Sequence, residues 1–146
     1  MSYAYARIRL QDTTYQPTVP WQLITCPDID QLNQIYRTYS KYKQFDSVMP
    51  IFDSEYTDPK NDIIGYTDQD QLVAFSIVRR YDTKNAECVQ FAWTYHNPAL
   101  RLGIESLKTE CAIYRDRGFE YLYLDQAHEY KKQFQGYQTL GPLQDL

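Results

Sequence analysis

The chain has 146 residues, a net charge of −4, and a composition that is 43% hydrophobic and 23% charged. These values describe a folded domain that can bury a core, and they exclude a collagen-like, coiled-coil or low-complexity chain. The acidic balance is the opposite of the basic footprint that nucleic-acid-binding proteins show. Tyrosine is the compositional outlier, with 15 residues, and it favours half-buried surfaces where its hydroxyl finds a partner.

The cysteines and the apolar runs indicate where such a chain resides. Cys26, Cys88 and Cys111 are an odd number at wide spacing, with no Cys-x-x-Cys pair, so neither a disulfide framework nor a zinc site is expected. No run of 18 apolar residues and no signal-peptide centre occurs, so no membrane association is expected. We therefore predict a cytoplasmic protein with reduced thiols, folded as one domain over residues 1–146.

The first half of the chain predicts strands, one helix and a long connection. Alternating apolar residues predict a strand over 2–10, and a short apolar run predicts another over 21–25. Apolar residues at intervals of three and four predict a helix over 28–43, with Asp28 at its start. Residues 44–60 contain two prolines and four acidic residues, and we interpret them as an irregular connection long enough to be a functional loop.

The second half predicts three antiparallel strands, a helix and a crossover strand. The expected elements are strands over 62–67, 71–81 and 86–95, a helix over 100–117, a strand over 119–124, a short helix over 125–133 and a strand over 134–140. Strict alternation along the third strand would place Cys88, Gln90 and Ala92 on one face. A strand–helix–strand crossover requires a parallel neighbour, so the fold class is α/β (α+β) with a mixed sheet.

This order of elements resembles that of the GCN5-related N-acetyltransferases over residues 62–142. A spaced pattern inside it is also similar to the C-terminal half of the arginyl-tRNA–protein transferases. The pattern consists of Tyr95-His-Asn-Pro, Leu102-Gly103, Ser106, Glu110, Ala112, Arg115, Gly118, Tyr121-Leu-Tyr-Leu, Tyr130-Lys131 and Phe134. The chain departs from that family after the Tyr-Leu-Tyr-Leu strand, where Asp125-Gln-Ala-His-Glu replaces a Ser-Cys-Pro segment.

The resemblance implies an acyl-CoA donor, in the first place acetyl-CoA. In that superfamily a Gln/Arg-x-x-Gly-x-Gly/Ala turn leads into the helix after the meander, and its backbone N–H groups hold the pyrophosphate. Here residues 97–104 contain one glycine, Gly103, and a proline. The donor-binding residues implied are Tyr95, Arg101, Leu102, Gly103 and Ile104. A lone glycine could instead serve close packing of the helix on the sheet.

The resemblance also implies an acid and a base, because N-acyl transfer must take a proton from the amine and return one to the leaving group. Glu87 is the candidate carboxylate on the third meander strand, Asp125 ends the crossover strand, and Tyr130 falls where the superfamily places a tyrosine acid. Each has a structural alternative. Glu87 could face solvent, Asp125 could cap a helix, and Tyr130 could be a half-buried packing residue.

Two functions are compatible with these residues. In the first, the protein transfers an acetyl group from acetyl-CoA, or an aminoacyl group from tRNA, to an amine on a small molecule or a protein. In the second, it is a catalytically silent relative that binds a partner, which the single glycine, the acidic charge and a tyrosine-lined helix face would suit. His96 and His128 do not have metal-ligand spacing, so no metal is expected.

Overall fold

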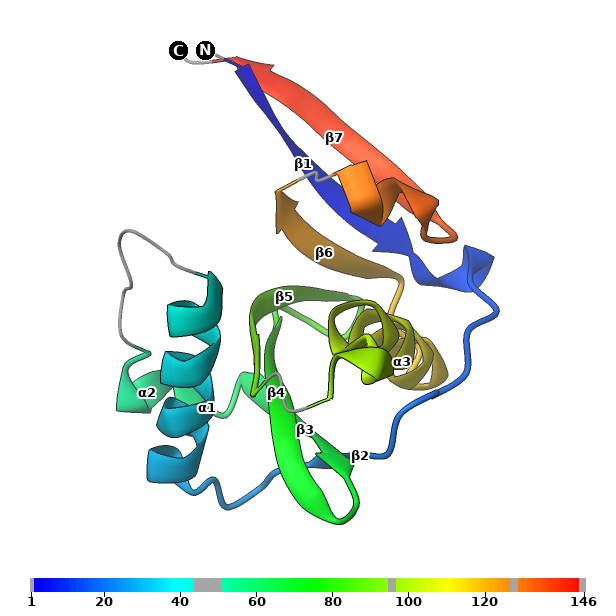
Figure 1. Ribbon diagram of the computed structural model, residues 1–146. Coiled ribbons are helices and arrows are strands. Elements are labelled where there is room, and N and C mark those ends of the chain that lie inside the picture. The colour runs from blue at the N-terminus through cyan, green and yellow to red at the C-terminus, as the bar shows by residue number, and fades with distance from the viewer. Residues whose placement is uncertain (1, 44–50, 95–96, 127–128, 145–146) are drawn as a thin grey trace.

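The computed structural model describes residues 2–43, 51–94, 97–126 and 129–144 (Figure 1). A seven-stranded mixed sheet with the order β2-β3-β4-β5-β6-β1-β7 organises these elements. The strands are β1 (Ser2–Arg9), β2 (Trp21–Leu23), β3 (Asn61–Asp68), β4 (Gln71–Arg80), β5 (Asn85–Trp93), β6 (Tyr121–Gln126) and β7 (Tyr137–Gln144). The α-helices are α1 (Ile29–Lys43), α2 (Asp53–Thr57) and α3 (Leu102–Asp116), with short 3₁₀ turns η1 (Leu10–Asp12), η2 (Pro98–Leu100) and η3 (Glu129–Gln133).

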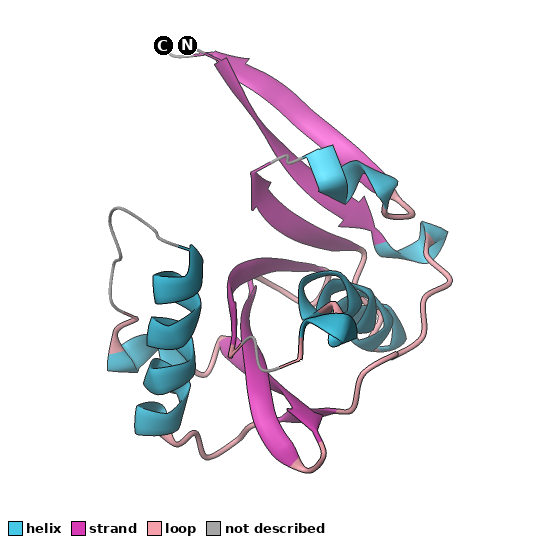
Figure 2. Ribbon diagram, viewed as in Figure 1, coloured by secondary structure: helices cyan, strands magenta, loops and turns pink. Residues whose placement is uncertain are grey.

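The meander β3-β4-β5 carries a core on each of its faces. Successive residues of a strand point to opposite faces. Ala74 of β4 packs with α3, and the next residue, Phe75, packs with α1. Consequently α1 and α2 cover one face of these central strands and α3 covers the other (Figures 1 and 2).

The crossover through α3 returns the chain to a parallel position beside the meander, as the sequence predicted. β6 pairs in parallel with β5 at Asn85↔Tyr121, Ala86↔Leu122 and Glu87↔Tyr123. Both strands continue beyond these pairs, β5 to Trp93 and β6 to Gln126. The two strands therefore part after Glu87 and Tyr123.

Several predicted boundaries are wrong. The connection over 44–60 contains α2, whose Tyr56 is 3% exposed and donates a hydrogen bond to Asn33 Oδ1 at 2.7 Å. Five residues are too few to show helical periodicity, so α2 leaves no sequence signal. β6 extends to Gln126, the helix expected after it is reduced to η3, and the last strand begins at Tyr137.

The expected alternation along β5 is also wrong, because the strand contains a β-bulge. Val78 pairs with Cys88, whereas Ile77 pairs with Gln90, so Val89 is an extra residue in β5. An extra residue reverses the facing of everything beyond it. Cys88 therefore packs on the α3 side and Ala92 belongs to the core on the α1 side.

Candidate active site

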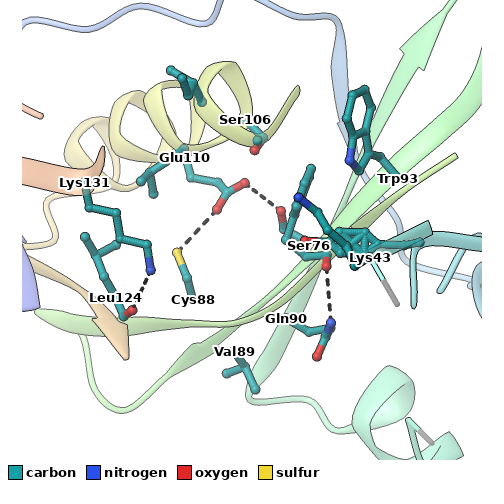
Figure 3. A pocket seen from close by; sticks show the side chains of 15 residues that line it. Lys43, Ser76, Cys88, Val89, Gln90, Trp93, Ser106, Glu110, Leu124 and Lys131 are labelled. Carbon is teal, nitrogen blue, oxygen red and sulfur yellow. Dashed lines mark hydrogen bonds between the residues drawn. The ribbon is translucent and has the colours of Figure 1, made fainter. Parts of the chain in front are cut away.

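A cavity of about 460 Å³ opens where β5 and β6 part. Its walls come from the bulged part of β5, Ser76 of β4, the N-terminal half of α3, the end of β6, η3 and the C-terminal turn of α1 (Figure 3). The residues from β5 are Cys88, Val89, Gln90, Phe91 and Trp93, and those from α3 are Gly103, Ile104, Ser106, Leu107 and Glu110. A volume of this size falls in the range of small-molecule sites.

The carboxylate of Glu110 is the centre of a hydrogen-bond cluster on the α3 side of this cavity. Tyr66 of β3 donates its hydroxyl to Glu110 Oε2, and Ser76 of β4 donates to the same oxygen at 2.7 Å. Cys88 of β5 places its thiol 3.4 Å from Oε1. Figure 3 shows the Glu110 side chain reaching from α3 toward Ser76 and Cys88. Three adjacent strands thus each contribute one donor to a single carboxyl group.

Burial shifts the pKa values of this cluster in one direction. Glu110 is 3% exposed, and burial raises the pKa of its carboxyl above the ordinary 4.5, with the three hydrogen bonds opposing the rise. Burial, followed by the nearby Glu110 charge, raises the pKa of the Tyr66 hydroxyl and of the Cys88 thiol well above their usual ranges. Tyr66 and Cys88 therefore stay protonated at neutral pH and act as donors to the carboxyl group.

Among the described residues, neutral groups supply the hydrogen bonds to the Glu110 carboxylate. Within these segments, none of the salt bridges involves its carboxylate. A buried carboxylate usually pairs with a cation because leaving the charge uncompensated is costly. A buried acid that is held only by neutral donors and faces a cavity is typical of a site that receives a cationic or proton-bearing ligand.

The N-terminus of α3 lies at the rim of the same cavity. The first backbone N–H of α3 that donates a hydrogen bond to a preceding carbonyl is that of Ile104, which donates to the Arg101 carbonyl at 3.0 Å. The N–H groups of Leu102 and Gly103 therefore have no partner within the helix. A Cβ added to Gly103 would meet nothing within 4 Å. Close helix–sheet packing therefore does not explain this glycine, and its open surroundings suit a ligand that approaches the backbone.

The predicted donor-binding residues divide between two cavities. Gly103 and Ile104 line the cavity with Glu110, and Leu102 beside them is fully buried in the core. Arg101, with a left-handed φ of 50°, lines a different cavity between the β3–β4 turn and the segment before β2. Tyr95 lies outside the described residues.

The predicted catalytic residues do not gather around Glu110 in the described part of the chain. Glu87 lines a third cavity together with Tyr81 and Tyr123. The Tyr81 hydroxyl donates a hydrogen bond to the Glu87 carboxylate. The backbone of Asp125 belongs to β6 and that of Tyr130 to η3, and their side chains lie outside the described residues. The described residues contain no group of three or more His, Cys, Asp or Glu side chains that could hold a metal ion.

Sequence reasoning passed over Glu110 as a chemical group, although a signal for it exists. Leu107, Cys111 and Tyr114 form the buried stripe of α3, and Glu110 falls inside that stripe at the helical interval. Carboxylates are rarely buried unless paired. A glutamate on the apolar face of an amphipathic helix therefore indicates a buried acid from the residue pattern alone.

Comparison with solved structures identifies the fold. The C-terminal domain of a provisionally named lysylphosphatidylglycerol synthetase from Agrobacterium fabrum superposes with a TM-score of 0.67 at 12% identity, covering 87% of this chain and 47% of that one. A GCN5-related N-acetyltransferase from Anabaena variabilis gives 0.63 at 12% identity, covering 96% and 38%. N-myristoyltransferase from Saccharomyces cerevisiae, with bound myristoyl-CoA, gives 0.64 at 11% identity, covering 94% and 47%.

The chain has the fold of the GCN5-related N-acetyltransferases, which confirms the fold that this resemblance implied; the local similarity to arginyl-tRNA–protein transferases stays a prediction. It spans less than half the length of the three structures compared. Neither a protein-family model nor a curated protein sequence matches it. No helix among the described residues is long and apolar enough to cross a membrane.

Proposed function

We propose that the protein transfers an acyl group from an acyl-CoA, acetyl-CoA in the first place, to an amine. The observation that carries this proposal is Glu110, a buried carboxylate without a cationic partner in the described segments, facing the cavity between the parted strands. A structure of this fold that was solved with myristoyl-CoA supports the choice of donor.

The residues at the α3 N-terminus fit the phosphates of such a donor. Gly103 is exposed, its amide has no partner within the helix, and the positive end of the helix dipole favours an anion there. The open space at Gly103 permits close approach. Bound in this way, the donor supplies an activated thioester to the cavity.

Glu110 is the proposed general base. Its carboxylate attracts the ammonium group of the acceptor and accepts a proton from it, which frees the nitrogen lone pair to attack the acyl carbon. Glu87 does not line this cavity, so Glu110 takes the role that the resemblance suggested for a carboxylate on the meander. Tyr130 and Asp125 stay candidates, by the resemblance alone, for the acid that returns a proton to the leaving thiolate.

Donor binding is tested by thermal unfolding with acetyl-CoA. A ligand at 100 times its Kd adds about 2.7 kcal/mol of stability, which raises the Tm of a chain of this size by roughly 5–10 °C. Gly103→Glu should abolish the shift by placing a negative charge at the phosphate position. Gly103→Ala should keep it, because the added Cβ meets open space. No shift of the wild-type Tm at millimolar acetyl-CoA would contradict CoA dependence.

The role of Glu110 is tested by Glu110→Gln, which keeps the shape of the side chain. Loss of a general base lowers kcat by about 10²–10⁴-fold, while the acetyl-CoA Tm shift persists. A variant that binds acetyl-CoA and transfers at the wild-type rate would contradict the proposed base. A wild-type protein that binds acetyl-CoA yet modifies no amine would support the silent relative instead, and co-purification with tRNA would support an aminoacyl-tRNA donor.

A further inference from the structure

Cys88 is the cysteine that lines the cavity at the parting strands. It is half-buried, and it shares the cavity wall with Glu110 and Gly103. The other two cysteines lie elsewhere, since Cys26 is exposed and lines another cavity and Cys111 is fully buried in the core. A donor that occupies the cavity at the parting strands therefore meets the thiol of Cys88 in its wall.

The backbone places Cys88 at the edge of the opening between the strands. β5 and β6 pair in parallel as far as Glu87↔Tyr123, so Cys88 is the first residue of β5 beyond this pairing. The bulge at Val89 follows directly. Bulges re-aim side chains and are over-represented next to active sites. The thiol therefore belongs to the part of β5 from which β6 has parted.

The Cys88 thiol and the Glu110 carboxyl group form a pair of nucleophile and base. Tyr66 and Ser76 both donate to Oε2 of this carboxyl group. The Cys88 thiol lies 3.4 Å from Oε1 and is the hydrogen-bond partner of that oxygen among the described residues. Figure 3 shows the two oxygens turned toward different partners, one toward Ser76 and one toward Cys88. A nucleophile within hydrogen-bond reach of its base is the arrangement that covalent catalysis requires.

Burial makes this thiol depend on its base. It raises the pKa of the Cys88 thiol well above its usual range, so thiolate is scarce at neutral pH and the proton must leave as the sulfur attacks. Burial also raises the pKa of the Glu110 carboxyl, which makes its carboxylate a stronger proton acceptor. The hydrogen bond between the two groups provides the path for that proton.

The donor can reach this thiol from the phosphate position at the start of α3. Gly103 and Glu110 lie on the same helix, about 10 Å apart along its axis. The extended arm of CoA between its phosphates and its sulfur is longer than this distance. A donor that is held by its phosphates beside Gly103 can therefore place its thioester beside Glu110 and Cys88.

We propose that Cys88 is the nucleophile that first receives the acyl group, which deepens the proposed acyl transfer and rests on it. In the first step the Cys88 sulfur attacks the acyl carbon, Glu110 takes the thiol proton, the bond from the acyl carbon to the CoA sulfur breaks, and CoA leaves as the thiol with that proton. In the second step an amine attacks the Cys88 thioester, Glu110 takes a proton from the nitrogen, and that proton returns to the Cys88 sulfur. One thioester replaces another in the first step, so the acyl group stays activated and no oxidant or reductant is needed.

The test omits the amine, so that the first step is observed alone. The full chain is mixed with acetyl-CoA, quenched in acid and analysed by intact mass and peptide mapping. We expect a single acetyl group per chain on Cys88, formed with an equivalent amount of free CoA and removed by neutral hydroxylamine, which cleaves thioesters and leaves amides intact. Cys26 is the internal control, because chemical acetylation without a site would favour an exposed cysteine. With its base, Cys88 should be acetylated about 10²–10⁴-fold faster than Cys26.

Variants separate the nucleophile from the hydrogen-bond donor. Cys88→Ala should abolish the acetyl label, and the matched control Cys26→Ala should keep it. Glu110→Gln should slow the labelling of Cys88 by about 10²–10⁴-fold, while the Tm shift with acetyl-CoA persists. Cys88→Ser keeps a donor to Glu110 but cannot form a thioester, so the label that neutral hydroxylamine removes should vanish. A retained Tm shift with acetyl-CoA shows that each variant is folded and binds the donor.

The outcomes distinguish this proposal from the acyl transfer on which it rests. A wild-type chain whose Tm rises with acetyl-CoA but that carries no acetyl group on Cys88 overturns the intermediate, and acyl transfer stands if an amine is still modified. Transfer to an amine by Cys88→Ser at the wild-type rate also overturns it. Double-reciprocal plots for acetyl-CoA and the amine that intersect do the same, because an acyl-enzyme gives the parallel lines of ping-pong kinetics. Absence of a Tm shift and of any acetylation of protein or amine overturns the two proposals together.

Discussion

The hydroxyl of Tyr66 controls how readily Glu110 ionises, and Tyr66→Phe tests this directly. Tyr66 is fully buried, and its hydroxyl is one of three donors to the Glu110 carboxyl. Donors stabilise the ionised form and lower its pKa, whereas burial raises it. Removing one donor leaves burial less opposed, so the pKa of Glu110 rises further.

The size of the shift follows from the energy of the lost bond. A hydrogen bond to a charged group contributes about 1.5–3 kcal/mol, and each pKa unit corresponds to about 1.4 kcal/mol. Tyr66→Phe should therefore move the pKa of Glu110 upward by roughly 1–2 units. If Glu110 is the base, the acid limb of the pH profile of kcat/KM moves to alkaline pH by the same amount. The transfer rate at a pH below that limb falls about tenfold for each unit.

Two measurements check this shift. The first is kcat/KM for acetyl transfer as a function of pH. The second, independent of activity, is a ¹³C NMR titration of the glutamate carboxyls, with Glu110→Gln used to assign the signal. Ser76→Ala, which removes the bond of 2.7 Å, should move both readouts in the same direction. A titration of Glu110 that stays in place or moves to acidic pH in both variants would refute the cluster as the control of this carboxyl group.

Three further predictions concern stability. The pKa of Glu110 is higher in the folded than in the unfolded state. The free energy of unfolding should therefore fall as the pH rises from the unfolded-state pKa of this carboxyl through its folded-state pKa. Denaturant titrations of Glu110→Gln should lack this pH dependence. Tyr114→Phe removes a bond of 2.6 Å to buried Asp62 and should cost about 1.5–3 kcal/mol in urea unfolding, with the pH profile of transfer unchanged. Gly136→Ala forces a Cβ against the Arg9 carbonyl oxygen at a φ of +73° and should lower the free energy of unfolding by about 1–3 kcal/mol. Gly118→Ala places its Cβ in open space at a φ of +86°, so its Tm should fall less than that of Gly136→Ala.

The elements that sequence predicts well are those with local periodicity. The meander, α3 and the parallel return of β6 follow from alternation, helical spacing and the geometry of crossovers. The bulge at Val89 does not, because an extra residue becomes visible only when the partner strand is known. That single residue decides which side chains of β5 face α3, and it changed the face of Ala92.

The acid cluster escaped prediction for a related reason. Tyr66, Ser76 and Cys88 are separated from Glu110 by 44, 34 and 22 residues along the chain. No spacing rule connects them, because they meet through the order of three neighbouring strands under one helix. The large number of tyrosines has the same explanation in part, since Tyr56, Tyr66 and Tyr114 are core residues whose hydroxyls each donate to a side chain distant in sequence.

Two buried carboxylates between α3 and the sheet, those of Asp62 and Glu110, show why charge compensation distinguishes a structural role from a chemical one. Asp62 accepts from Tyr114 and also pairs with Arg117 at 2.8 Å and Arg80 at 3.3 Å. Its charge is balanced inside the protein, so it links α3 to β3 and has no need of a ligand.

Glu110 has neutral donors in place of those guanidinium groups, so its ionised form gains most from a cation that arrives through the cavity. An ammonium ligand would favour the ionised carboxylate and lower the pKa of Glu110. By linkage, the ionised carboxylate would bind that ligand more tightly. Binding of the acceptor would then convert Glu110 to the ionised form that acts as the base. The pKa of Glu110 in the presence of an unreactive amine should therefore lie below its pKa in the free protein.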